Sequence, residues 1–430
     1  MKYRLSFLVL VLIILQSCSN TSAEKVTNKT DYDKYLDLSE NENLETAEQS
    51  NDFWLDKLNQ NPNGHAYMVK AASTYGRLFS TTGNIEFLKL SEENLIKANK
   101  RTKFNNPGYL KSLAHNYISQ HRFKEALKLL EKAENFQEGI EGTRKMLFDV
   151  HLELGNYVSA KTYLDKFVNF SDFDYLIRLS KWNDHKGNLD AAIKYMEKAV
   201  ARAESRNLKD LMQWSYTNIA DFYGHAGKIE TSYQYYLKAL ELDPNDAYSK
   251  KGIAWILYSH EKNPTEALRV LNTVTEKYYA PDYHLLKAEI AEYQGNKSLV
   301  DQQMALYHQA MTNEAYGDMY NKYKVLVYAD DSRFRQDAIE IAQMEVKNRP
   351  TPQSYDLLAW AYFKNGNLNK ALDITGKYVL DKTFEPEALY HTAEIFKANG
   401  ETEVIQNIKK ELLASVYELG PNMASKIEKL

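Results

Sequence analysis

Residues 213–245 read QWSYTNIADFYGHAGKIETSYQYYLKALELDPN, and this stretch decides the fold. Apolar and small residues recur every three to four positions on each side of Gly227, as on one face of a helix. The first face carries Tyr216, Ile219, Ala220 and Tyr223, and the second carries Ser232, Tyr236, Ala239 and Leu240. Pro244 ends the second helix, because its ring clashes with the preceding turn and it lacks an N–H. The stretch therefore predicts two short antiparallel helices joined by a tight turn.

The same two-helix unit recurs along the chain at a spacing close to 34 residues. Equivalents of the turn at Gly227 fall at Gly83, His121, Gly155, Gly187, Glu261, Gly295, Arg333, Gly366 and Gly400. Several steps are 34 residues (261 − 227 and 295 − 261 are two), and the other steps imply short insertions. Glycine accounts for only 17 of 430 residues and proline for 9, so helix breakers are scarce. These observations predict an almost wholly helical chain of about ten units.

Small residues occupy equivalent positions in these units. Ala220, Ala254 and Ala359 share one position in the first helix, and Ala126 and Ala192 share one in the second. Helix axes only 8–10 Å apart leave no room for a long side chain where two helices cross. A shared phase of small residues is therefore expected of helices that pack in pairs, and not of a helical chain that is merely rich in alanine.

The 34-residue period, the helix–turn–helix pattern and the shared small positions resemble the tetratricopeptide repeat. The resemblance implies an all-α fold, an α–α superhelix (tetratricopeptide solenoid) of about ten helix–turn–helix repeats over residues 66–419. Residues 44–65 are predicted to form an N-terminal capping helix, since the first unit of a solenoid is atypical. Residues 420–430 begin with Gly-Pro, which ends the last long helix, and are predicted to form a C-terminal cap.

The N-terminus has the features of an export signal. Residues 1–17 combine basic residues at positions 2 and 4 with an apolar run of eleven residues, which is too short to span about 30 Å of hydrocarbon. Leu15-Gln16-Ser17-Cys18 resembles a bacterial lipobox, although a smaller residue than Gln16 is usual. The resemblance implies lipidation of Cys18, the only cysteine, followed by a polar tether over residues 18–43. A plain secretory signal with a chance cysteine is the alternative.

The predicted export signal also bears on the net charge of the mature chain and on its expected location in the cell. The chain has 54 Lys and Arg against 58 Asp and Glu, and loss of Lys2 and Arg4 with the signal leaves 52 − 58 = −6. A mildly acidic chain lacks the clustered cations that phosphate backbones require, so we expect no nucleic-acid partner. Residues 19 and 20 are Ser and Asn rather than an Asp-type retention signal. We therefore expect a membrane partner through the lipid anchor and a place in the bacterial cell envelope, at the outer membrane.

Motifs for catalysis are missing from the sequence. It contains no HExxH, Walker loop, GxSxG or Cys/His metal spacing. The ten histidines are scattered, and His121, His185 and His225 fall at turns between helices. We therefore expect no enzyme activity, no cofactor and no metal site.

Binding residues are predicted from the resemblance, which implies that the first helix of each unit lines a concave groove. Large aromatic and polar residues occupy the groove positions, and such rings bury much area at little entropic cost. The candidates are Trp214, Asp221, Tyr248, Lys251, Trp255, Tyr258, Tyr320, Tyr323, Trp360 and Phe363. The alternative is that these rings pack against the neighbouring helix of a tightly wound array.

Two functions agree with this sequence. The first is a non-enzymatic, lipid-anchored tetratricopeptide scaffold that binds a protein or peptide partner in its groove, as in the bacterial envelope lipoproteins that the chain resembles. The second is a glycan- or nutrient-capture lipoprotein that works with an outer-membrane transporter. The nearly continuous repeats favour the first, because receptors of the second kind interrupt a few repeats with long insertions.

Overall fold

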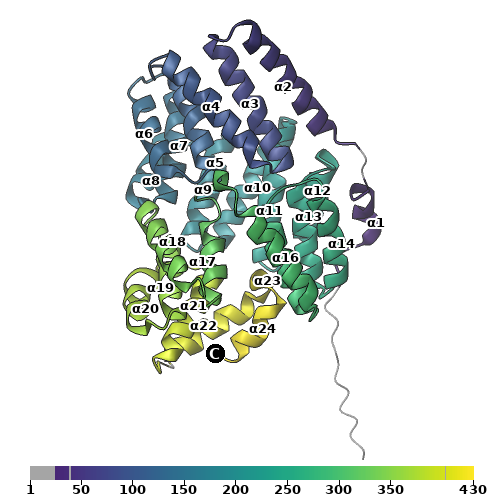
Figure 1. Ribbon diagram of the computed structural model, residues 1–430, viewed down its shortest axis with the longest axis vertical. Helices are drawn as coiled ribbons and strands as arrows, with labels where there is room; N and C mark the ends of the chain where they lie inside the picture. The colour runs from purple at the N-terminus through teal and green to yellow at the C-terminus, as the bar shows by residue number, and fades with distance from the viewer. Residues whose placement is uncertain (1–24, 38–39, 402) are drawn as a thin grey trace, which may run out of the picture.

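The computed structural model describes residues 25–37, 40–401 and 403–430, in which all regular structure is helical (Figure 1). Within these residues ten antiparallel helix pairs follow one another, each joined by a turn at a position predicted from the sequence. The pairs are α3 (His65–Thr82) with α4 (Ile85–Arg101), α5 (Pro107–Ser119) with α6 (Phe123–Glu134), α7 (Ile140–Glu153) with α8 (Tyr157–Leu164), α9 (Phe173–His185) with α10 (Leu189–Ser205), α11 (Lys209–His225) with α12 (Ile229–Leu242), α13 (Ala247–Trp255) and its π-helical extension η3 (Ile256–His260) with α14 (Pro264–Thr275), α15 (Asp282–Tyr293) with α16 (Lys297–Ala310), α17 (Asn321–Asp330) with α18 (Arg335–Asn348), α19 (Pro352–Lys364) with α20 (Leu368–Ile374) and the π-helical η5 (Thr375–Val379), and α21 (Pro386–Ala398) with α22 (Glu403–Ala414). The prediction of an all-α superhelix of about ten helix–turn–helix repeats is confirmed.

The local chemistry of each pair is the one that the sequence predicts. Gly227 ends α11 in the left-handed region at φ 71°, which other residues enter only at a steric cost. Ala220, Ala254 and Ala359 are completely buried where helices cross. A larger side chain at these positions would force the two helix axes apart.

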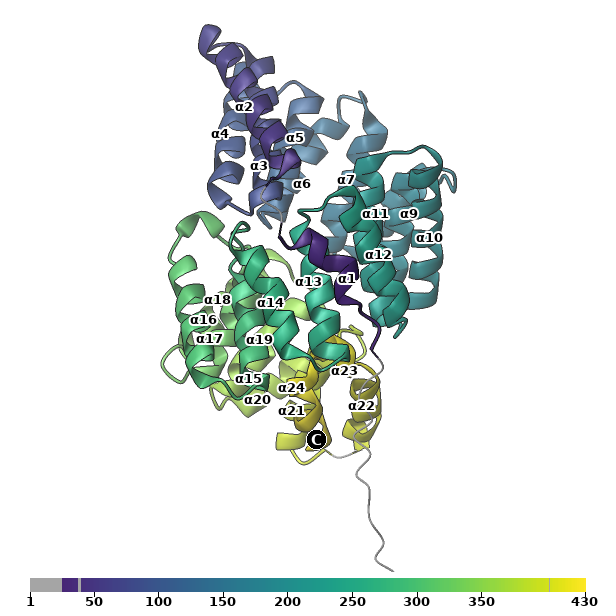
Figure 2. The ribbon, with the colours of Figure 1, turned by 90° about the vertical axis from the view of Figure 1, so that its right-hand side faces the viewer.

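Successive turns of the superhelix touch; in the side view α3 and α4 lie directly above α14 and α16 (Figure 2). The N–H of Tyr279 donates to the carbonyl of Thr82 at 2.8 Å, and Arg349 pairs with Glu153 at 3.2 Å. The second pair is separated by 196 residues in the chain, which is close to six units of about 34 residues. The pitch of the superhelix is therefore short enough for loops one turn apart to support each other.

The N-terminal part of the described chain lies against the middle of the superhelix. Residues 25–37 contain α1 (Lys29–Tyr32) and η1 (Asp33–Tyr35), and they run along α12 and α14. The carboxylate of Glu261 accepts hydrogen bonds from the N–H groups of Val26 and Thr27, and the buried Tyr32 donates to Glu266 at 2.9 Å. The polar tether predicted over residues 18–43 is thus not a free linker over residues 25–37. Their main-chain donors and aromatic rings find partners on the repeats.

Helix α2 (Glu42–Gln60) packs against α3 and precedes the repeats. The predicted signal peptide, residues 1–17, and Cys18 lie outside the described residues. In the part of the chain that is described, no helix is both long and apolar enough to cross a bilayer.

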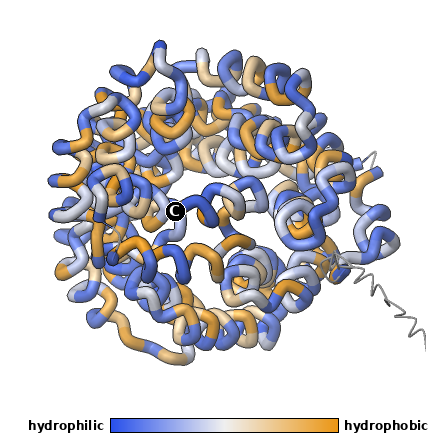
Figure 3. Tube along the Cα trace, turned by 90° about the horizontal axis from the view of Figure 1, so that it is seen from below, coloured by the Kyte–Doolittle hydropathy of each residue, from blue (hydrophilic) through white to orange (hydrophobic). Residues whose placement is uncertain are grey.

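The C-terminal residues turn back into the superhelix. Helix α24 (Pro421–Glu428) covers α22 with the buried Ile427, and α23 (Val416–Leu419) contacts α11, η3 and α21. Figure 3 shows the C-terminus inside the ring of helices. The C-terminal segment therefore does more than cap the last repeat, because it also bridges the interior.

Candidate concave binding site

One open part of the concave surface lies around Trp214 on α11, and another of about 740 Å³ lies between α3 and α5. Trp214 is 42 % exposed, and Tyr248, at the start of α13, is 50 % exposed. Trp214 and Asn218 line two adjoining cavities of about 680 Å³ and about 520 Å³. Tyr248 belongs to the first cavity and Asp221 to the second. Three of the predicted residues, Trp214, Tyr248 and Asp221, are thus brought together at one site.

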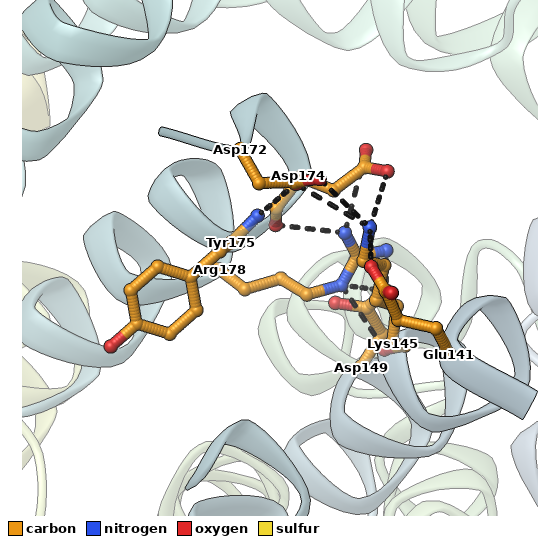
Figure 4. A network of polar contacts seen from close by, with 7 residues as sticks. All are labelled: Glu141, Lys145, Asp149, Asp172, Asp174, Tyr175 and Arg178. Carbon is orange, nitrogen blue, oxygen red and sulfur yellow. Dashed lines mark hydrogen bonds and ion pairs between the residues drawn. The ribbon is translucent and has the colours of Figure 1, made fainter. Parts of the chain in front are cut away.

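One wall of the second cavity is a network of ion pairs between α7 and α9 (Figure 4). The Arg178 guanidinium pairs with Asp149 at 2.7 Å, and the Lys145 ammonium lies 3.1 Å from Asp174 and 3.3 Å from Asp172. Although burial alone would lower it, the pKa of Lys145 is raised, because Glu141 at 2.9 Å and then Asp174 and Asp172 favour its charged form. The network holds two neighbouring first helices at a fixed spacing and leaves little free charge for a polyanionic ligand.

Asp221 and Tyr248 hold each other in place. The Tyr248 hydroxyl donates to Asp221 at 2.7 Å, and the buried Tyr236 donates to the other carboxylate oxygen. Burial raises the pKa of Asp221 although both hydrogen bonds act to lower it. Lys251 is paired with Asp282 at 2.6 Å, so its charge is already compensated. The exposed ring of Tyr248 is therefore rigidly placed beside the first cavity.

Two predicted groove residues lie beneath the C-terminal segment. Tyr258 is completely buried and donates to Glu289 at 3.0 Å. The indole N–H of Trp255 donates to the main-chain carbonyl of Tyr417 at 3.0 Å. The prediction of an open groove at these two positions is wrong, because α23 covers them.

Three predicted aromatic residues pack on the neighbouring unit or beside it. Trp360 is only 8 % exposed, and its ring stacks on His391 of the next unit with centroids 4.0 Å apart. Phe363 lies 5.4 Å from the Trp360 ring and is partly buried. Tyr320 meets Tyr316 edge-to-face at 5.2 Å. For Trp360 and Tyr320 the packing alternative describes the contacts.

Tyr323 is partly buried, 6.0 Å from the Tyr320 ring. Sequence reasoning missed Tyr417 and Glu418, which reach the concave surface from the far end of the chain. The Glu418 carboxylate lies 3.1 Å from Nδ1 of His225. The only signal nearby was Gly420-Pro421, which indicates the end of a helix but not where the next residues go.

The site offers binding contacts rather than a reactive centre. Within the residues that the structure describes, no cluster of three or more His, Cys, Asp or Glu side chains is arranged to hold a metal ion. Its exposed groups are two aromatic rings, an amide and several carboxylates and cations that largely pair with one another. Such a surface can take up an extended chain by ring contact and hydrogen bonds.

The fold and the concave site define a helical-repeat solenoid, a class that presents an extended inner surface for recognition. Residues 173–206 and 215–246, the pairs α9/α10 and α11/α12, match the tetratricopeptide repeat family. The chain therefore contains tetratricopeptide repeats, and its ten described helix pairs form the all-α superhelix that such repeats build. Repeats of this kind generally serve as scaffolds for protein partners.

Comparisons with whole known proteins find only distant likenesses. No functionally curated protein matches the chain. Similar solved structures include the human IFIT1 dimer with m7Gppp-AAAA, at 14 % identity over 73 % of this chain and 70 % of that one, with a TM-score of 0.46. The APC/C hetero-tetramer Cut9–Hcn1 is similar at 14 % identity over 94 % and 98 % of the two chains, with a TM-score of 0.33. At TM-scores below 0.5 neither likeness supports an inference about ligands.

Proposed function

We propose that the chain is a non-enzymatic, lipid-anchored scaffold of the bacterial cell envelope that binds an extended protein segment around Trp214. The observation that carries this proposal is the exposed Trp214 ring between two adjoining cavities on the concave surface. Elsewhere on that surface the predicted aromatic groups Tyr258 and Trp360 are already covered by the chain itself.

The chemistry of the site favours a peptide over a polyanion. Trp and Tyr rings contribute large rigid contact areas and dominate many protein interfaces. Arg178 and Lys181 on the cavity wall are each paired, with Asp149 at 2.7 Å and Glu153 at 2.9 Å. Asn218 and Asp221 offer hydrogen bonds to a main chain lying across α11. We therefore expect a segment with an apolar side chain for Trp214 and a free main chain beside it.

The anchor part of the proposal rests on the lipobox-like residues 15–18 and on Cys18 being the only cysteine. Val26, whose N–H donates to Glu261, follows Cys18 by eight positions. Eight extended residues span at most about 26–29 Å. An acylated Cys18 would therefore hold the superhelix by its middle, near α12 and α14, and would leave the concave surface clear of the bilayer.

Replacing Cys18 with alanine is expected to release the protein from membranes, because stable attachment depends on the acyl chains. Fractionation of cells that express the wild type and Cys18→Ala, with labelled palmitate in the medium, measures this. The wild type should pellet and carry label, whereas the variant should be soluble and unlabelled. A variant that still pellets, beside an unlabelled wild type, would show that the lipid reading is wrong.

A photo-crosslinking side chain at position 214 tests the binding site. p-Benzoylphenylalanine replaces Trp214 in one strain and Val158 in another, since Val158 on α8 is 85 % exposed outside both cavities. We expect crosslinks at position 214 that map to one contiguous segment of one envelope protein. The synthetic segment should then bind wild type at least tenfold more tightly than Trp214→Ala, as expected of an aromatic hot spot worth about 2 kcal/mol.

Equal crosslinking at both positions, or none at position 214, would contradict the proposal. Adducts at position 214 that consist of glycan would instead support the nutrient-capture function. Circular dichroism of Trp214→Ala provides the folding control, and its helicity should equal that of the wild type.

A further inference from the structure

The C-terminal segment makes specific contacts with the concave surface. The carbonyl oxygen of Tyr417 accepts two hydrogen bonds, from the Trp255 indole at 3.0 Å and from the Ser259 hydroxyl at 2.6 Å. The side-chain amide of Asn422 donates to the carbonyl of Glu289 at 2.9 Å. The first two contacts join residues 162 and 158 positions apart in the chain. They fix a main-chain segment on the surface where the fold would otherwise present a groove.

Side chains of the segment also find matching positions. A Cβ atom on Gly224 would lie 3.0 Å from the Tyr417 ring, so the absence of a side chain on α11 makes room for that ring. The carboxylate of Glu418 lies 3.1 Å from His225. Gly420 has φ 81° and lies against Trp255 and Glu289. An aromatic ring, a carboxylate and a tight turn thus follow one another along the groove.

The segment is held differently from the core around it. Helix α23 has only four residues, none of which is fully buried. The Tyr417 carbonyl accepts hydrogen bonds from η3, and the Tyr417 ring packs on Gly224 and on the core beside it. Val416 and Leu419 are only partly buried, at the edge of the cluster in which the buried Ile427 packs with Ile408 and Leu412. Residues 416–420 and the first turn of α24 can therefore leave the concave surface while Ile427 keeps the rest of α24 on α22.

The position of the segment continues the site around Trp214. His225 lines the cavity of about 520 Å³ together with Trp214, and it also lines the neighbouring cavity of about 230 Å³ together with Glu418. A ligand that starts at Trp214 and runs along α11 would next meet Glu418 and Tyr417. The open site and the covered site are parts of one groove.

We infer that residues 416–422 are an internal ligand of the groove, and that the partner peptide competes with them through an aromatic residue directly followed by a carboxylate. The partner chemistry rests on the proposed peptide-binding function, whereas the internal ligand does not. Tyr417 and Glu418 show which groups the groove accepts, because Gly224 receives a ring and His225 receives a carboxylate.

The electrostatics make this internal ligand displaceable. Asp184 and Glu385 repel the charge of Glu418, while His225 attracts it. Burial lowers the pKa of His225, but the hydrogen bond and charge of Glu418 raise it above its usual value. The ion pair between Glu418 and His225 is therefore fully formed below about pH 6.5, where the imidazole is charged whether the segment is docked or not. It weakens as the pH rises further.

A labelled peptide that copies residues 413–424 tests the inference on the full chain. In the wild type the internal copy competes at an effective concentration on the order of millimolar, so the added peptide should bind weakly. Tyr417→Ala in the chain should improve binding of the peptide at least tenfold, measured by fluorescence anisotropy. Glu418→Gln should improve it by a smaller factor. Ser425→Ala, an exposed change on α24, should leave binding unchanged.

Two further measurements decide the outcome. A peptide with alanine in place of its tyrosine should not bind the Tyr417→Ala chain. Thermal unfolding of both variants should remain cooperative, and a loss of folding in both would show that residues 416–422 belong to the core and would overturn the inference. Folded variants that bind the peptide no better than the wild type would overturn it too. If the peptide result is positive but position 214 gives no crosslinks, the internal ligand stands and the proposed partner fails.

Discussion

Replacing Trp360 with alanine is expected to lower the free energy of unfolding by about 3–5 kcal/mol, as for other large aromatic residues in a core. Its ring is 8 % exposed and stacks on His391, which forms an ion pair of 2.9 Å with the buried Asp356. The substitution leaves a cavity between α19 and α21 and exposes this pair to water. Urea denaturation followed by circular dichroism at 222 nm measures the change.

Trp214→Ala is the matched control, because it removes the same ring from an exposed position of a first helix. Its unfolding free energy should change by no more than about 0.5 kcal/mol, as is usual for surface substitutions. If Trp360→Ala were as stable as Trp214→Ala, Trp360 would not be the structural residue that its contacts indicate. The two variants together separate rings that build the superhelix from rings that are free to bind.

The repeat architecture was predictable because its causes are local. The period of the turns and the small residues at Ala220, Ala254 and Ala359 depend only on how two adjacent helices pack. Gly227 marks its turn because a left-handed residue ends α11 there. The sequence of each unit is therefore sufficient to predict its own helix pair, and the ten pairs are predicted one by one.

The openness of the groove was not predictable, because it depends on contacts between distant residues. The aromatic positions on the first helices share one spacing, yet Trp214 is exposed and Tyr258 is buried. The difference arises from the C-terminal segment, in which the main chain of Tyr417 reaches Trp255 from 162 residues away. The repeat pattern of the sequence gives no information on where the segment after the last repeat packs.

The sequence left the tightness of the superhelix open, as one of two alternatives for the aromatic rings, for a similar reason. Its pitch is set by small rotations between successive units, and these add up to bring Arg349 against Glu153. The contact of His391 with Trp360, by contrast, depends only on the rotation between two adjacent units. The sequence pattern of a single repeat therefore does not determine how open the concave surface of the whole superhelix is.

The second large effect concerns Glu289, whose carboxyl lies beneath the C-terminal segment. Burial raises its pKa to about 7. The hydrogen bond from Tyr258 and the charge of Lys426 act to lower this pKa. The negative charges of Glu292 and Glu387 raise it further. In the unfolded chain the same group ionises near pH 4.5. The folded chain therefore binds the proton more tightly, and Glu289 makes the fold less stable as the pH rises from 4.5 to 7.

Glu289→Gln is expected to be about as stable as the wild type at pH 5 and about 2 kcal/mol more stable at pH 7.5, a figure reduced from the full shift because the group is partly exposed. Urea denaturation at both pH values measures the difference. Glu241→Gln, an exposed carboxylate on α12, should change stability equally little at both. A pH-independent difference for Glu289→Gln would show that this carboxyl ionises normally.

The comparison is made between two chains at each pH, because other groups titrate in the same range. Burial lowers the pKa of His115, His121, His151 and His185, and these groups stabilise the fold as the pH rises toward 6.5. They are common to both chains and cancel. The backbone of Gly420 covers the Glu289 carboxyl, so ionisation of this buried carboxyl favours opening of the docked segment to water. Hydrogen exchange in residues 416–422 should therefore rise with pH more steeply in the wild type than in Glu289→Gln, and equal slopes would show that the segment does not respond to this carboxyl.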